Sequence, residues 1–316
     1  MKLINQTLTV FDRFQQRHRS AGFIYAVIKK YGEDEAGYQA ALLTYYGFLS
    51  VFPLLLVLTT VTSFLAHSHP GWQDTIIKSM TDYFPVLGNQ LSEHVHSLNK
   101  NGLALAIGLL FTLYGARGVA DSFRYGVNHI WQVPRVNRQG FPKSLLTSLM
   151  LIIVSGLGLL LASIGAASAA NIGHGWGFRI LSFAVDIFLL FWLFDFLLNI
   201  CLPRHVTIKQ ARSGALTAAV GLVILQAFGG YLLTRELKNL DALYSSFAIT
   251  LGLLFWIYLQ AQVLYYAVEV SAVKAEKLWP RSLQGNLTPA DRKAYARLAS
   301  KEKIVSQEHI ATSFDH

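Results

Sequence analysis

Cysteine and charge are both scarce in this sequence of 316 residues. Cys201 is the only cysteine, so an internal disulfide is excluded, and no Cys-His spacing typical of a metal site is present. Charged residues make up 14% of the chain, whereas a soluble domain carries about 25%. Hydrophobic residues make up 53%. This balance argues against an ordinary soluble domain and favours a chain that lies mostly in lipid.

Six long apolar segments account for that composition. A helix rises about 1.5 Å per residue, so about 20 residues cross the roughly 30 Å hydrocarbon core of a bilayer. The segments all reach this length: they are Tyr38–Leu65, Gly102–Phe123, Leu145–Ala170, Phe178–Leu202, Gly214–Leu233 and Leu243–Val273. The sequence therefore predicts an all-α, polytopic membrane protein with six transmembrane helices and amphipathic helices at the membrane surface.

The lysines and arginines between these segments are distributed unevenly. If the N-terminus is cytoplasmic, 21 of the 27 Lys and Arg residues fall on the cytoplasmic side and five on the other, with Arg117 inside a span. This bias is the positive-inside rule, and it predicts that both termini face the cytoplasm. The formal net charge of +9 is then mainly a topology signal, so we expect no nucleic-acid partner.

The chain divides into three parts. Residues 1–37 form a cytoplasmic segment, in which Ala21–Tyr31 has the apolar spacing of an amphipathic helix on the inner leaflet. Residues 38–273 form the six-helix domain, with an external helical loop at 66–101. Residues 274–316 form a basic cytoplasmic tail with one helical patch and a disordered end.

Several polar residues fall within the spans at one depth. A charge near the bilayer centre costs about 2.5 kcal/mol or more, so such groups usually face a bundle interior or a water-filled cavity. Arg117 and Asp195 lie roughly 22–25 Å below the outer ends of their spans, and we expect Arg117 to pair with Asp121, with Asp195 or with both. The predicted polar cavity comprises Arg117, Asp121, Asp195, Asn199, Gln260 and Gln262. Either it receives a head group or an ion from the cytoplasm, or its residues are contacts that hold the bundle together.

Three further positions in the spans carry separate expectations. Asp186 lies higher in its span, and it is either a protonated carboxyl in a helix contact or part of a proton path. Pro53 lacks the N–H donor for one helix bond and should kink the first span. Glu269 lies at the inner interface, where we expect it to be solvated or paired.

Histidine pairs in the external loop resemble metal ligands only at first sight. His67 and His69 are two residues apart, as are His94 and His96, so on a helix the members of each pair point away from each other. The sequence also lacks a Gly-rich phosphate loop, a nucleophile elbow and a paired-carboxylate motif. We therefore expect no metal, no cofactor and no enzyme activity.

Three motifs together resemble the YihY/BrkB family of bacterial inner-membrane proteins. They are YQAALLTYYGFLSVFPLLL at Tyr38–Leu56, NHIW at Asn128–Trp131, and Tyr244–Ser246 followed by Trp256–Tyr258 and Glu269. The resemblance covers about Ala21–Trp279, with one departure, since Ala267 stands where the family often has glycine. It implies a six-helix inner-membrane protein. Family members carried a ribonuclease label that is generally regarded as mistaken, and others are linked to envelope lipid handling.

The polar layer, the proline in the first span and the amphipathic segments favour a protein that transports or flips a lipid or another amphiphilic envelope compound. Its partners would be membrane lipids, and the sequence leaves a homo-oligomer open. One alternative is a scaffold that recruits envelope enzymes through its basic tail, and deletion of Ser282–His316 should abolish a scaffold but spare a transporter. The other alternative is a ribonuclease, which the missing metal motif disfavours.

Overall fold

The structure is a computed structural model that describes residues 2–65, 102–171, 176–202, 206–237, 245–283 and 287–314. Within these residues the chain forms helices and no strand, which confirms the all-α class. The predicted external loop at 66–101 lies outside the described residues. The α-helices are α1 (Lys2–Arg17), α2 (Arg19–Glu33), α3 (Ala36–Leu65), α6 (Gly102–Ile130), α7 (Lys143–Asn171), α8 (Trp176–Cys201), α9 (Ile208–Leu237), α10 (Ser245–Glu276) and α11 (Pro289–Ser300).

Long apolar helices dominate the described part of the chain. Three of the helices described are long and apolar enough to cross a bilayer, and they are Trp176–Cys201, Ile208–Gly229 and Thr250–Glu276. A shorter apolar helix covers Lys143–Leu159. The remaining spans and the orientation of the termini stay predictions.

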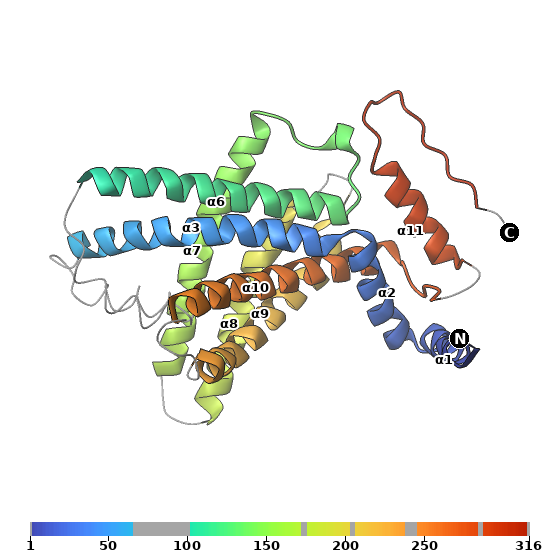
Figure 1. The fold of residues 1–316 in the computed structure, drawn as a ribbon, viewed down its shortest axis with the longest axis horizontal. Helices are drawn as coiled ribbons and strands as arrows, with labels where there is room; N and C mark the ends of the chain where they lie inside the picture. Colours follow the sequence, from blue (N-terminus) through green and yellow to red (C-terminus); the bar gives the residue numbers. More distant parts are fainter. Residues whose placement is uncertain are drawn as a thin grey trace.

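Helices α3, α6 and α10 lie side by side, and α7 crosses them (Figure 1). Helix α8 packs between α7 and α9, and α9 in turn packs along α10. Helices α1, α2 and α11 gather at one end of the bundle, so both termini lie at the same end of the molecule (Figure 1).

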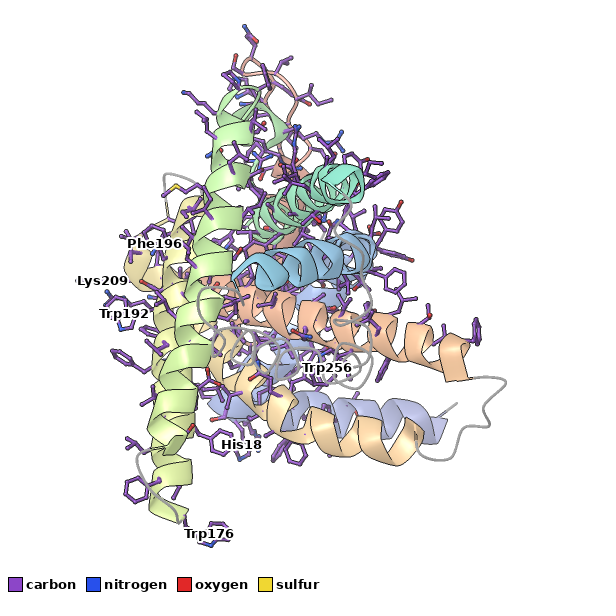
Figure 2. All side chains as sticks on the ribbon, turned by 90° about the vertical axis from the view of Figure 1, so that its left-hand side faces the viewer. His18, Trp176, Trp192, Phe196, Lys209 and Trp256 are labelled. Carbon is purple, nitrogen blue, oxygen red and sulfur yellow. The ribbon has the colours of Figure 1, made fainter. Side chains whose placement is uncertain are left out.

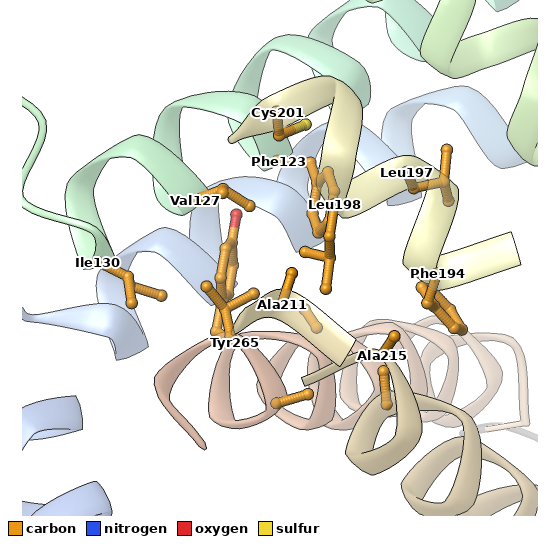
Figure 3. Close-up of a cluster of buried hydrophobic side chains, with 14 of the residues drawn as sticks. Phe123, Val127, Ile130, Phe194, Leu197, Leu198, Cys201, Ala211, Ala215 and Tyr265 are labelled. Carbon is orange, nitrogen blue, oxygen red and sulfur yellow. The ribbon is translucent and has the colours of Figure 1, made fainter. Parts of the chain in front are cut away.

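The apolar core forms where α6, α8, α9 and α10 meet (Figure 3). Ala211 and Ala215 of α9 are fully buried there, and their small side chains allow the helices to approach closely. Tyr265 of α10 points its hydroxyl toward α6, where it donates to the Ser122 carbonyl at 3.1 Å. A Cβ at Gly126 would lie 2.4 Å from the Tyr265 ring, so only glycine fits opposite this tyrosine.

Large apolar side chains also cover the outside of the bundle. Figure 2 shows Trp192 and Phe196 of α8 pointing away from the neighbouring helices, and both are exposed. Leu157 and Leu161 of α7 are exposed as well. Soluble monomers rarely expose contiguous apolar surface on this scale, so the pattern fits helices whose solvent is lipid.

The amphipathic helix expected over Ala21–Tyr31 is α2. Its apolar face is divided, however, because Val27 and Tyr31 are buried against the protein while Ile24 and Ile28 are exposed. The packing of α2 against α10 accounts for the buried half. One half of the apolar face is therefore held by protein contacts, and the position of the helix on the inner leaflet stays a prediction.

The helical patch expected in the tail is α11, which begins with a capping box. The Thr288 side chain accepts from the Asp291 N–H, and the Asp291 side chain accepts from the Thr288 N–H. Ala294 of α11 is buried in a small apolar cluster with Val27 of α2 and Val273 of α10. The tail as far as α11 is thus an integral part of the fold.

Candidate functional site

Arg117 and Asp121 lie one turn apart on α6 and form the expected ion pair. Arg117 Nε is 3.5 Å from Asp121 Oδ2. Asp121 Oδ1 also accepts hydrogen bonds from Arg124 Nη2 at 3.1 Å and from Ser148 Oγ of α7 at 2.5 Å. The Arg117 side chain is 51% exposed. The pair therefore lies on an open face of α6, beside α7, and not at the centre of the bundle.

Asp195 and Asn199 form a second polar group, on α8. The Asp195 side chain is buried, and its Oδ1 lies 3.9 Å from Nε of Arg212 on α9. Asn199 Nδ2 donates to the Asp195 backbone carbonyl at 2.6 Å. The arginine opposite Asp195 is thus Arg212, and within the described residues no ion pair joins Asp195 to Arg117.

The remaining predicted positions lie in α3, α8 and α10. Gln260 and Gln262 are partly buried on α10, and the Gln260 Nε2 atom has no hydrogen-bond partner in the part of the chain that the structure describes. Asp186 is partly buried on α8. Helix α3 is continuous through Pro53, and the kink there stays a prediction. A single cavity shared by the α6 and α8 groups also stays a prediction.

The most deeply buried charges lie elsewhere, where α2 packs against α10. Lys30, Asp34 and Glu269 are almost completely or completely buried. Lys30 Nζ donates to Asp34 Oδ2 and, at 3.0 Å, to Glu269 Oε2. Gln132 Nε2 donates to the other oxygen of Asp34 at 3.2 Å. Of the two environments that the sequence predicts for Glu269, solvated or paired, the structure shows the second, and the side chain is fully buried with a partner from the N-terminal segment.

Lys30 also caps the C-terminus of α6. Its Nζ donates at 2.7 Å to the Ile130 carbonyl, one of the carbonyls that a helix end leaves without an intrahelical donor. Helix α6 ends in a Schellman motif, in which the Val133 N–H donates to the Asn128 carbonyl at 2.9 Å and Gln132 adopts a φ of 53°. The NHIW motif is therefore the last turn of α6, held against the buried charges.

The charge of Lys30 is stabilised by its surroundings. Burial alone would lower the pKa of Lys30, but the carboxylates of Glu269 and Asp34 outweigh this effect and raise it. The buried Lys30 ammonium is thus the shared hydrogen-bond donor to the buried carboxyl groups of Asp34 and Glu269. Without Lys30 these carboxylates would face each other with no counter-charge, which is a costly arrangement in a low-dielectric interior.

A second charge cluster joins the N-terminal helices to the tail. Arg281 is fully buried, its Nε donates to Asp291 Oδ1 at 2.5 Å, and its Nη2 donates to both Glu33 oxygens at 2.8 and 2.9 Å. Lys29 Nζ donates to the same Asp291 oxygen at 2.9 Å. Burial would raise the pKa of Asp291, but hydrogen bonds, first among them that from Arg281, hold it well below its usual range.

Sequence reasoning missed both clusters, although parts of each left a signal. Lys30 and Asp34 have the i, i+4 spacing of a helical ion pair, and Thr288 and Asp291 have the spacing of a capping box. Glu269 lies within a motif that resembles the last span of a known family. These signals identify the residues singly but do not show which of them meet.

Metal binding finds no support in the described residues. Among them, no group of three or more His, Cys, Asp or Glu side chains is placed to hold a metal ion. The histidine pairs at 67 and 69 and at 94 and 96 lie outside the described residues.

Comparison with known families gives a match over most of the chain. The family described as virulence factor BrkB matches residues 27–290. This chain belongs to the BrkB family. The match begins within α2, includes both Lys30 and Glu269, and ends one residue before Asp291.

Curated relatives of this BrkB family protein are distant. The putative ribonuclease-like protein YfkH of Bacillus subtilis is 26% identical over 81% of this chain and 97% of its own length. The inner membrane protein YhjD of Escherichia coli is 23% identical over 87% of this chain and 88% of its own. A UPF0761 membrane protein of Psychrobacter is 26% identical over 80% of this chain, which spans about half (48%) of that relative. No solved structure matches the chain.

These names agree with the apolar helices in placing the BrkB family protein in a membrane. Several relatives are named membrane proteins, and one is named an inner membrane protein. The expectation of a membrane protein of the YihY/BrkB type is therefore confirmed.

Proposed function

We propose that this BrkB family protein transports or flips a lipid or another amphiphilic envelope compound across the bacterial inner membrane, with both termini in the cytoplasm. The observation that carries the proposal is the open face of α6. Leu110, Tyr114, Arg117 and Asp121 follow one another along this face, three or four residues apart, and none of them is buried. The face is apolar at one end and charged at the other, as an amphiphile is.

The charged end of this face needs a polar partner. It lies in the second predicted span, where an arginine exposed to hydrocarbon would cost several kcal/mol by order of magnitude. Asp121 offsets part of that cost, but half of the Arg117 side chain is still open. A planar guanidinium binds phosphate or carboxylate oxygens through two parallel hydrogen bonds, so an anionic head group would suit this position.

Reconstitution tests the proposal. Vesicles of phosphatidylethanolamine and phosphatidylglycerol carry a fluorescent phosphatidylglycerol, and dithionite bleaches the probe in the outer leaflet. We expect the protein to make the inner probe accessible, and Arg117→Gln to slow this by about tenfold, the size of a lost charge-assisted hydrogen bond. Leu157→Ala, at an exposed apolar position of α7, is the matched control and should leave the rate unchanged. Rates equal to those of protein-free vesicles would count against the proposal.

The scaffold alternative is favoured by one observation. Ile304 and Val305, which follow α11 in the tail, are exposed apolar side chains that a partner protein could cover. Deletion of Ser282–His316 does not separate the two functions, because it removes Asp291, the ion-pair partner of Arg281, together with α11, which packs against α2 and α10. The double substitution Ile304→Ser and Val305→Ser is the sharper test. It should abolish recruitment by a scaffold and leave lipid translocation unchanged.

A further inference from the structure

Helix α1 is attached to the rest of the protein by its polar edge. Gln15 Nε2 donates to the Arg281 backbone carbonyl at 2.5 Å, and Asp12 Oδ1 accepts a hydrogen bond from the Leu283 N–H at 2.8 Å. Gln15 is only 1% exposed. These contacts with the segment after α10 fix the rotation of α1 about its own axis.

The apolar side chains of α1 consequently point away from the protein. Val10, Phe11 and Phe14 are 67%, 54% and 49% exposed. At about 100° per residue, the three side chains fall within one arc of roughly 100° around the helix. A surface helix of a soluble protein buries its apolar face, whereas α1 exposes these apolar side chains and buries the polar Gln15.

Exposed arginines border this apolar arc. Arg13 and Arg17 lie on one side of the arc, Asp12 and Gln15 lie on the other, and Arg19 follows the end of the helix. The three arginines are exposed, and none of them forms an ion pair with another described residue. An exposed apolar arc with a basic flank is typical of helices that lie in the interface of an anionic membrane.

We propose that α1 binds the surface of an anionic lipid bilayer. Val10, Phe11 and Phe14 insert below the head groups, while Arg13 and Arg17 contact the lipid phosphates. Charge complementarity favours lipid as the occupant, because phosphates neutralise the arginines while acyl chains cover the apolar arc. The polar edge of the helix stays bound to the protein, so α1 fixes the end of the bundle to the membrane surface. This role does not depend on what the bundle transports.

Spin labels on the full-length protein in nanodiscs test the proposal. In a Cys201→Ser background, Phe14→Cys places a nitroxide on the apolar arc, and Gln16→Cys places the matched control on the exposed polar face. In discs of phosphatidylethanolamine and phosphatidylglycerol, the ratio of oxygen to nickel-chelate accessibility should be several-fold higher at position 14. Discs of phosphatidylcholine alone, or the pair Arg13→Gln and Arg17→Gln, should lower the ratio at position 14 toward that of the control.

Two results would overturn the proposal. Equal ratios at the two positions in the anionic discs would show that the arc faces water. Exclusion of both reagents from position 14, together with dipolar coupling between labels on two copies, would show that a second copy covers the arc. Phe11→Cys repeats the measurement from a second position of the arc, should Phe14→Cys alter the gel-filtration profile.

Discussion

Lys30 Nζ lies 3.0 Å from Glu269 Oε2, although 239 positions separate the two residues in the chain. The contact joins α2, which precedes the first predicted span, to the end of α10. Asp34 completes the cluster, and the Ile130 carbonyl adds the end of α6. One ammonium group therefore holds together the end of the bundle where both termini lie.

Removal of this ammonium should destabilise the protein strongly. Lys30→Ala leaves Asp34 and Glu269 buried without a counter-charge, and we expect a loss of about 3–5 kcal/mol in the free energy of unfolding. The midpoint of thermal unfolding in detergent measures the effect. Lys274→Ala, at an exposed position of α10, is the matched control and should change the midpoint little.

Replacement of Glu269 by glutamine should recover part of the stability that is lost when Lys30 is replaced. The double variant Lys30→Met with Glu269→Gln removes the ammonium together with one of its two acidic partners, so it should be more stable than Lys30→Met alone. A double variant as unstable as the sum of the two single variants would show that the charges act independently. The geometry of the cluster would then have no energetic consequence.

Acid should weaken the attachment of the tail through Asp291. Because its pKa in the folded protein lies below that of an unfolded chain, the contribution of Asp291 to stability is complete above about pH 4 and is lost as the pH falls below that value. Thermal midpoints measured from about pH 6 down to pH 3 should therefore fall more steeply for the native protein than for Asp291→Asn. If the thermal midpoints of the two proteins fell in parallel with pH, Asp291 would not be the group whose protonation weakens the fold.

The apolar segments predicted the helices well, but the ends of only some of them. The segment Leu145–Ala170 corresponds to Lys143–Asn171, and Phe178–Leu202 to Trp176–Cys201. The segment Gly214–Leu233, by contrast, is part of a longer helix, Ile208–Leu237. Hydropathy detects only the stretch that suits lipid, whereas intrahelical hydrogen bonds continue through polar residues beyond it.

The charge clusters were predictable only in their local parts. The pair of Arg117 with Asp121 follows from i, i+4 spacing, and the structure confirms it. The partners of Glu269 and Asp195 do not follow from any local pattern, because they depend on which helices pack together. Equal depth in the membrane suggested that Arg117 could reach Asp195, but depth does not give the rotation of a helix, and the structure places Arg212 beside Asp195 instead.

The end of α10 should accept a stabilising substitution. Its Schellman motif pairs the Leu278 N–H with the Val273 carbonyl at 3.1 Å and places Lys277 at a φ of 55°, a backbone conformation that favours glycine. Lys277→Gly should therefore raise the free energy of unfolding by about 0.5–1 kcal/mol. Lys274→Gly, inside the same helix, should lower it by a similar amount. Thermal unfolding of the two variants should thus shift in opposite directions.

We expect the protein to have no ribonuclease activity, despite the name of one relative. The measurement is incubation of purified protein with labelled RNA, with and without a metal chelator. Cleavage that follows the protein through purification and disappears with chelator would contradict the expectation. The destabilised Lys30→Ala variant should unfold on heating. Cleavage that persists in the heated variant would therefore indicate a contaminant.

Gly214 of α9 should not tolerate a side chain, because α10 approaches it closely. A second substitution, Ala267→Gly, tests whether the backbone of α10 is the cause. A Cβ at position 214 would lie 2.7 Å from the Ala267 carbonyl oxygen and 2.9 Å from the Ser271 Cβ, both in α10, and we expect Gly214→Ala to cost about 1–3 kcal/mol. Because the nearest obstacle is a backbone atom, Ala267→Gly should not rescue Gly214→Ala. Gly156→Ala is the matched control, since nothing lies within 4 Å of a Cβ there. Rescue by Ala267→Gly would mean that the helices can shift apart, and that their contact is set by side chains and not by the approach of the two backbones.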